Sequence, residues 1–136
     1  MGIKFATEEW VKAACKELNN SKDYMDAAKN WEGDMYFIIE PEGAFKEKVI
    51  EYFDNYHGEC RAAAIIADES SKTPAYRFWA PYGIWKQILQ AKMDPIKAMM
   101  SGKLNLKGNM GQIMKMPRAA VELVNCFLKI DTEYPD

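Results

Sequence analysis

Four short apolar segments follow one another in the middle of the chain, and a turn sequence bounds each of them. They are Met35–Ile39, Lys48–Tyr56, Cys60–Ala67 and Ala75–Ala80. Their β-branched and aromatic residues, with Gly and Pro between the segments, are typical of β-strands. Because short turns join antiparallel strands, we expect these four segments to form an antiparallel meander.

Helical periodicity precedes this block. Thr7 followed by two glutamates is typical of a helix start, and apolar residues then recur at helical spacing as far as Leu18. Asn19-Asn20 breaks the pattern, and Ser21 can begin a second short helix that ends near residue 29. The first 30 residues are therefore expected to form an N-terminal helical extension.

The C-terminal third combines helices with one more strand. A helix is predicted from Tyr82 to about residue 92, and Asp94-Pro95 begins another, because an N-cap aspartate precedes proline at the first helical position. Lys103–Lys107 alternates strictly and predicts a fifth strand. A last helix follows Asn109, and Pro117 within it should kink or split it.

This order of elements predicts an α+β fold, with a five-stranded, mixed and mainly antiparallel sheet covered by helices. About 20 helical residues precede the fifth strand, enough for a crossover connection, so the fifth strand is expected to pair parallel to a neighbour. The length of 136 residues is typical of one domain. We therefore expect residues 1–136 to form a single domain.

Composition excludes several classes of protein. The net charge of −2 gives no nucleic-acid signature, and no segment approaches the roughly 18 apolar residues of a membrane span. The three cysteines, Cys15, Cys60 and Cys126, are odd in number, widely spaced and without a CxxC pair. This pattern indicates no disulfide framework and a reducing compartment, with the cytoplasm as the expected location.

The only histidine, His57, lies three residues before Cys60. Residues an odd number apart on a strand point to opposite faces, so a Cys–His nucleophile pair is not expected. One histidine and scattered cysteines also supply no closed set of metal ligands. We therefore predict a structural histidine, and we expect no catalytic residue, metal or cofactor.

Methionine is concentrated in one part of the chain. Six of the nine methionines fall within 24 residues. They are Met93, Met99, Met100, Met110, Met114 and Met116. Methionine is flexible and polarisable and adapts to varied apolar partners, and a helix kinked at Pro117 cannot close tightly on a sheet. These features predict the wall of an apolar ligand cavity, although ordinary core packing is the alternative.

The same segment is basic. Between Lys86 and Val121 there are seven basic residues and one acid, Asp94, so this segment carries +6 while the rest of the chain carries −8. An apolar pocket with a cationic rim would suit a ligand with an apolar tail and an anionic head. Lys103 and Lys107 are the candidates for contact with that head group. A solvated basic face without a ligand is the alternative.

The stretch Asp94–Gly108, which reads DPIKAMMSGKLNLKG, resembles the C-terminal signature of the sterol carrier protein type 2 domain family. In that family a short helix ends in a small residue plus Gly-Lys, and a strand, a glycine and a further helix follow. The order of elements from Met35 to Ile130 is also similar. The chain differs from the eukaryotic pattern in its N-terminal helical stretch and in lacking the peroxisomal C-terminus.

The resemblance implies a sheet covered by helices around an apolar tunnel. It also implies non-catalytic binding and transfer of fatty acyl chains, acyl-CoA or sterol-like lipids. The tunnel-side residues that it implies are Ile88, Leu89, Ile96, Met99, Met100, Leu104, Leu106, Met110, Ile113 and Met114, and the last helix, with Val121, Val124 and Leu128, would cover or gate the tunnel.

The expected partner is thus an apolar small molecule or lipid, with transient membrane contact, no nucleic acid, and a monomer or homodimer as the working form. Two other functions stay open. One is an enzyme acting on acyl or CoA-linked substrates, for which His57 is the only obvious base. The other is a protein-interaction module that uses the basic face.

Overall fold

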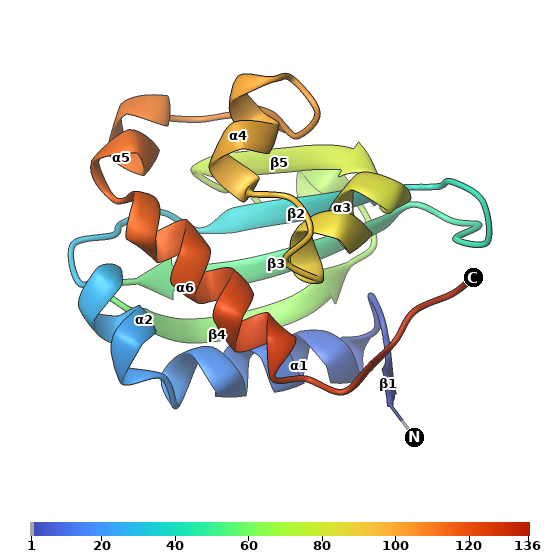
Figure 1. The fold of residues 1–136 in the computed structure, drawn as a ribbon, viewed down its shortest axis with the longest axis horizontal. Coiled ribbons are helices and arrows are strands. Elements are labelled where there is room, and N and C mark those ends of the chain that lie inside the picture. The colour runs from blue at the N-terminus through green and yellow to red at the C-terminus, as the bar shows by residue number, and fades with distance from the viewer. Residues whose placement is uncertain (1) are drawn as a thin grey trace.

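A five-stranded mixed sheet forms the centre of the protein, as Figure 1 shows for the computed structural model, which describes residues 2–136. The strand order is β4-β3-β2-β5-β6. The strands are β2 (Met35–Glu40), β3 (Val49–Tyr56), β4 (Glu59–Ile66), β5 (Tyr76–Pro81) and β6 (Asn105–Lys107). Each predicted strand is therefore confirmed, with both ends within two residues of the prediction. The predicted α+β class is confirmed as well.

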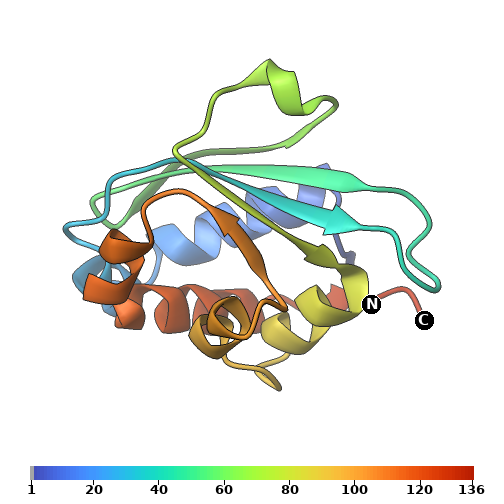
Figure 2. The same cartoon turned by 90° about the horizontal axis from the view of Figure 1, so that it is seen from above.

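The pairing of the strands differs from the expectation. β2, β3 and β4 form the antiparallel meander, but β5 leaves it and pairs parallel to β2. β6 then pairs antiparallel to β5, so the expected parallel pairing of the fifth strand is wrong. The parallel pair arises earlier because the connection from β4 to β5 crosses a whole face of the sheet, as Figure 2 shows.

The crossing connection covers apolar side chains on that face. Tyr36 and Ile38 of β2 are buried there, together with Ile50 and Tyr52 of β3. The connection contains the short 3-10 helix η1 (Glu69–Ser71). The Tyr36 hydroxyl donates a hydrogen bond to the carbonyl oxygen of Glu69 at 3.0 Å and accepts one from the backbone N–H of Lys72 at 3.0 Å. The connection thus acts as a second cover for the sheet.

Six helices cover the opposite face (Figures 1 and 2). They are α1 (Glu8–Asn19), α2 (Lys22–Ala27), α3 (Tyr82–Leu89), α4 (Pro95–Met100), α5 (Met110–Lys115) and α6 (Pro117–Leu128). The predicted caps are confirmed: Thr7 accepts a hydrogen bond from the backbone N–H of Trp10 at 3.2 Å, and Asp94 accepts one from that of Ile96 at 2.7 Å. Pro117 splits the last helical region into α5 and α6, as expected.

The two ends of the chain meet in a small parallel sheet that the sequence did not predict. β1 (Ile3–Lys4) pairs with β7 (Thr132–Glu133). Phe5 follows β1 and packs against Tyr134 with ring centroids 5.2 Å apart. Among residues 2–136, no helix has both the length and the apolar character needed to cross a membrane.

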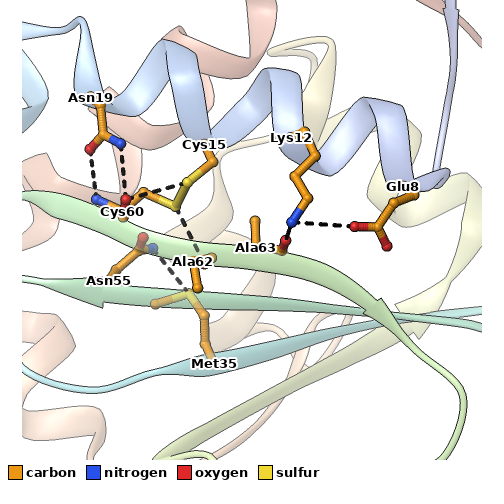
Figure 3. Close-up of a disulfide and its surroundings, with 9 residues drawn as sticks. All are labelled: Glu8, Lys12, Cys15, Asn19, Met35, Asn55, Cys60, Ala62 and Ala63. Atoms are coloured by element: carbon orange, nitrogen blue, oxygen red, sulfur yellow. Dashed lines mark hydrogen bonds and ion pairs between the residues drawn. A yellow bond between two sulfur atoms is a disulfide. The ribbon is translucent and has the colours of Figure 1, made fainter.

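Helix α1 is bound along its length to the edge strand β4, as Figure 3 shows. The side-chain amide of Asn19 donates to the carbonyl of Cys60 at 2.9 Å and accepts from its N–H at 2.8 Å. Lys12 donates to the carbonyl of Ala63, and Glu8 accepts from the N–H of Ile65 at 2.9 Å. These polar side chains recur at helical spacing and so satisfy the backbone groups that an edge strand leaves unpaired.

A disulfide between Cys15 and Cys60 also joins α1 to β4 (Figure 3). The expectation of no disulfide is therefore wrong, and the cytoplasmic assignment loses the support that it drew from the cysteines. The two Cα atoms are 5.5 Å apart although 45 positions separate them in the sequence. Spacing alone did not reveal the pair, because the packing of α1 on β4 brings it together. Cys126 is free and buried.

Loss of this disulfide should lower the free energy of unfolding by about 2–4 kcal/mol, because a crosslink across a loop of this length restricts the unfolded chain. The comparison is denaturant unfolding of the wild type and of the double variant Cys15→Ser/Cys60→Ser, each with and without dithiothreitol. The reductant should destabilise the wild type and leave the double variant unchanged. Equal stability of reduced and oxidised wild type would contradict the prediction.

Candidate functional site

An apolar cavity of about 80 Å³ lies between the helical layer and the sheet. Its floor consists of side chains from the two parallel central strands. Met35 and Phe37 come from β2 and Phe78 comes from β5. Phe37 and Phe78 face each other across the strand pair, with ring centroids 5.6 Å apart. The parallel pairing of β2 and β5 therefore builds the floor.

Helix α3 forms one wall of the cavity. Trp85, Ile88 and Leu89 line the cavity and are buried. The indole N–H of Trp85 donates to the carbonyl of Ile38 in β2 at 2.9 Å, and its ring lies 5.0 Å from that of Phe37. This hydrogen bond satisfies the polar atom of Trp85 and fixes α3 over the floor.

Short helices form the rest of the covering layer. Met99 of α4 and Ile113 of α5 line the cavity. Helix α6 contributes a row of mostly small or branched residues, Ala119, Ala120, Leu123 and Val124. α4 and α5 have six residues each, so they owe their position to packing more than to their own hydrogen bonds.

Six of the thirteen residues expected to contact a ligand line this cavity. They are Ile88, Leu89, Met99, Leu104, Ile113 and Val124. Ile96, Leu106 and Met110 are partly buried against the core beside it. The interior of the methionine-rich third is thus part of the wall.

The other four expected residues lie on the surface, contrary to the inward orientation that we expected. Met100 is 73% exposed, and Met114, Val121 and Leu128 are between 39% and 45% exposed. Successive helical residues point about 100° apart, so Met99 and its neighbour cannot both face the cavity. The break at Pro117 also gives α5 and α6 separate buried faces.

Several lining residues were missed because they precede the methionine-rich third or resemble ordinary core. They are Tyr24, Trp31, Met35, Phe37, Phe78, Trp85, Pro95, Ala119, Ala120 and Leu123. Met116, one of the methionines expected in the cavity wall, does line the cavity. Alternation along β2 does place Met35 and Phe37 on one face. That pattern does not distinguish a cavity floor from a filled core.

The two lysines proposed for the head group lie at the ends of the β6 region. Lys103 and Lys107 are both exposed. Lys103 directly precedes the lining residue Leu104. Neither lysine is part of the cavity wall itself.

His57 lies in the turn between β3 and β4. It has φ +50° and precedes Gly58 with φ +81°, which is the backbone of a tight two-residue hairpin turn. Its Nε2 atom lies 2.7 Å from Oε2 of Glu32, and its ring stacks on Tyr56. The Cys60 sulfur is bonded to Cys15, so it is not a thiol partner for His57. Within residues 2–136, no group of three or more metal-ligating side chains occurs.

Two buried polar side chains on β3 stand out electrostatically. Glu51 and Asn55 are each 1% exposed. The Oε2 atom of Glu51 and the Oδ1 atom of Asn55 have no hydrogen-bond partner within residues 2–136. Burial raises the pKa of Glu51 to about 8, so its carboxyl group is largely protonated at neutral pH. Glu51 pairs in register with the floor residue Phe37.

Comparisons with a family model and with solved structures point to the same family. The model of the SCP-2 sterol transfer family matches residues 9–120. A crystal structure of sterol carrier protein 2 is 31% identical, with a TM-score of 0.84 over 93% of this chain and 98% of that chain. A solution structure of a Thermus thermophilus protein, described as possibly a sterol carrier protein, is 29% identical, with a TM-score of 0.86 over 97% and 95%.

A more distant structure, Sterol Carrier Protein-2 from Aedes aegypti in complex with palmitate, shares the fold. It is 17% identical, with a TM-score of 0.53 over 82% of this chain and 93% of that chain. No curated protein matches the chain.

The stability of the protein should fall as the pH rises from about 5 to 8. The pKa of Glu51 is about 8 in the folded state and 4.5 for an ordinary glutamate, so the folded state holds the extra proton in this window. The slope from this residue reaches about 1.4 kcal/mol per pH unit. Glu51→Gln should remove it in denaturant unfolding across this range, whereas Glu9→Gln, at an exposed position, should keep the wild-type slope. An unchanged slope in Glu51→Gln would refute the assignment.

Proposed function

Since the chain belongs to the SCP-2 sterol transfer family, we propose that it binds an apolar lipid, such as a fatty acyl chain, in the cavity beneath α3–α6 and transfers it. The observation that carries this proposal is the cavity, whose lining consists almost entirely of apolar side chains. Such a lining favours burial of a hydrocarbon chain and supports binding without chemistry. The palmitate held by the Aedes aegypti relative is consistent with this class of ligand.

The cavity must enlarge to admit a long chain. Its volume of about 80 Å³ is smaller than the roughly 150 Å³ of an apolar cavity that binds benzene. Met35, Met99 and Met116 line it, and methionine side chains change conformation at low cost. The short helices α4 and α5 are the elements that can move with least loss of structure. We therefore propose an opening of the layer formed by α4, α5 and α6.

The energetics allow useful affinity. Burial of about 14 methylene groups contributes about 11 kcal/mol at ~0.8 kcal/mol each. Association and ordering cost about 4–15 kcal/mol, and the work of opening the cavity adds to that cost. At the lower end of that cost the net gain is about 7 kcal/mol, which corresponds to a Kd of about 10 μM. A flexible lining favours breadth over selectivity.

Contact with a membrane fits the outer surface of the same helices. Met100 of α4, Met114 of α5 and Val121 of α6 are exposed apolar side chains. Lys97 and Lys103 lie close to Met100 in sequence and are exposed as well. Exposed apolar side chains with neighbouring lysines suit transient contact with an anionic bilayer. Lipid would then enter and leave on the side that faces the membrane.

Filling the cavity should weaken ligand binding. Wild-type protein should bind cis-parinaric acid saturably at one site, and palmitate should displace it. Ala120→Phe should weaken binding at least ten-fold, because Ala120 lines the cavity, while Asn125→Phe, at an exposed position of the same helix α6, should bind as the wild type does. Absence of saturable binding, or wild-type affinity in Ala120→Phe, would refute the proposal.

Membrane contact should depend on charge. Lys97→Gln/Lys103→Gln should weaken binding to phosphatidylcholine vesicles that contain phosphatidylserine by about 30-fold at low salt, since each lysine near an anionic surface contributes ~1 kcal/mol. Vesicle flotation at low and high salt measures this. The control Lys4→Gln/Lys46→Gln removes the same charge at exposed positions elsewhere and should bind normally. An equal loss of vesicle binding in both double variants would argue against membrane contact through this surface.

A further inference from the structure

Glu51 is the one carboxyl group among residues 2–136 that is almost fully buried, and its Oε2 atom has no hydrogen-bond partner there. It lies on β3, near the middle of the sheet. A buried polar atom without a partner destabilises the folded state. An apolar residue of similar size would avoid that cost, so the carboxyl group is not explained by packing.

The position of Glu51 links it to the cavity. It lies directly opposite Phe37 in the register of β2 and β3, and paired side chains on neighbouring strands have Cβ atoms about 4.5–5.5 Å apart. Phe37 forms part of the cavity floor. Glu51 does not line the cavity itself, but in the register of the sheet it is the direct neighbour of a floor residue.

Asn55 repeats the arrangement on the same face of β3. Its Nδ2 atom contacts the Sδ atom of Met35 at 3.8 Å, as Figure 3 shows, and Met35 is another floor residue. Its Oδ1 atom has no partner within residues 2–136. Both buried side-chain oxygens that lack a partner thus stand beside residues of the cavity floor.

We propose that the Glu51 carboxyl group hydrogen-bonds a neutral polar end, a hydroxyl or carbonyl group, of the lipid whose apolar part fills the cavity. This inference rests on the proposed function and specifies its ligand. A protonated carboxyl group both donates and accepts hydrogen bonds, so it serves a hydroxyl group and a carbonyl group equally. An ionised head group would instead stay at the solvent-exposed rim, because burial of a charge without a counter-charge is costly.

The test compares 1-dodecanol with dodecane, which differ only in the hydroxyl group, as competitors of bound cis-parinaric acid. The wild type should prefer 1-dodecanol by about ten-fold, the effect of one net hydrogen bond. Glu51→Leu should lose this preference and keep its affinity for dodecane. Glu51→Gln retains a donor and an acceptor and should keep most of the preference. Glu9→Leu, at an exposed position, should behave as the wild type does.

Equal displacement by the two competitors in the wild type would overturn the inference, and so would a preference that survives in Glu51→Leu. Circular dichroism melting shows whether each variant is folded, and Glu51→Met, which is also apolar and should likewise lose the preference, carries the test if Glu51→Leu is not folded. Failure of cis-parinaric acid to bind the wild type at all would instead refute the proposed function. The two failures are therefore distinguishable.

Discussion

Strand β2 is apolar on both faces, and the rest of the fold depends on covering both. Phe37 points toward the helices, while Tyr36 and Ile38 point the other way, and all three are buried. Such a strand is stable only inside a sheet with cover on each side. The helices supply one cover and the connection from β4 to β5 supplies the other. Because that connection must cross the sheet, β5 arrives beside β2 and completes the cavity floor.

The sequence predicted those features that depend on near neighbours. The caps at Thr7 and Asp94 and the break at Pro117 are decided within one helical turn, and alternation or apolar runs identified the strands. Pairing was less predictable, because the place of β5 depends on how a connection crosses the sheet. The disulfide depends likewise on where α1 lies, and no local pattern encodes that position.

The candidate site was predicted in part for the same reason. The C-terminal wall was recognisable because methionine density and the family resemblance coincide there, and Met99 and Ile113 do line the cavity. The cavity floor was not recognisable from the sequence, because Phe37 and Phe78 follow a pattern that any buried strand shares. Alternation along β3 places Glu51 on the face opposite Ile50, but it does not show that both faces are buried. The burial of Glu51 was therefore missed.

The contact between α1 and β4 bears on the opening of the helical layer that we propose for lipid exchange. Opening of the helical layer loosens the packing over the sheet, and a loosened edge strand is a template for pairing with a second copy. The covalent bond at Cys15 and the hydrogen bonds of Lys12 and Asn19 keep the β4 edge occupied throughout. The opening proposed for α4, α5 and α6 would therefore leave the β4 edge, at the other side of the molecule, closed to pairing with a second copy.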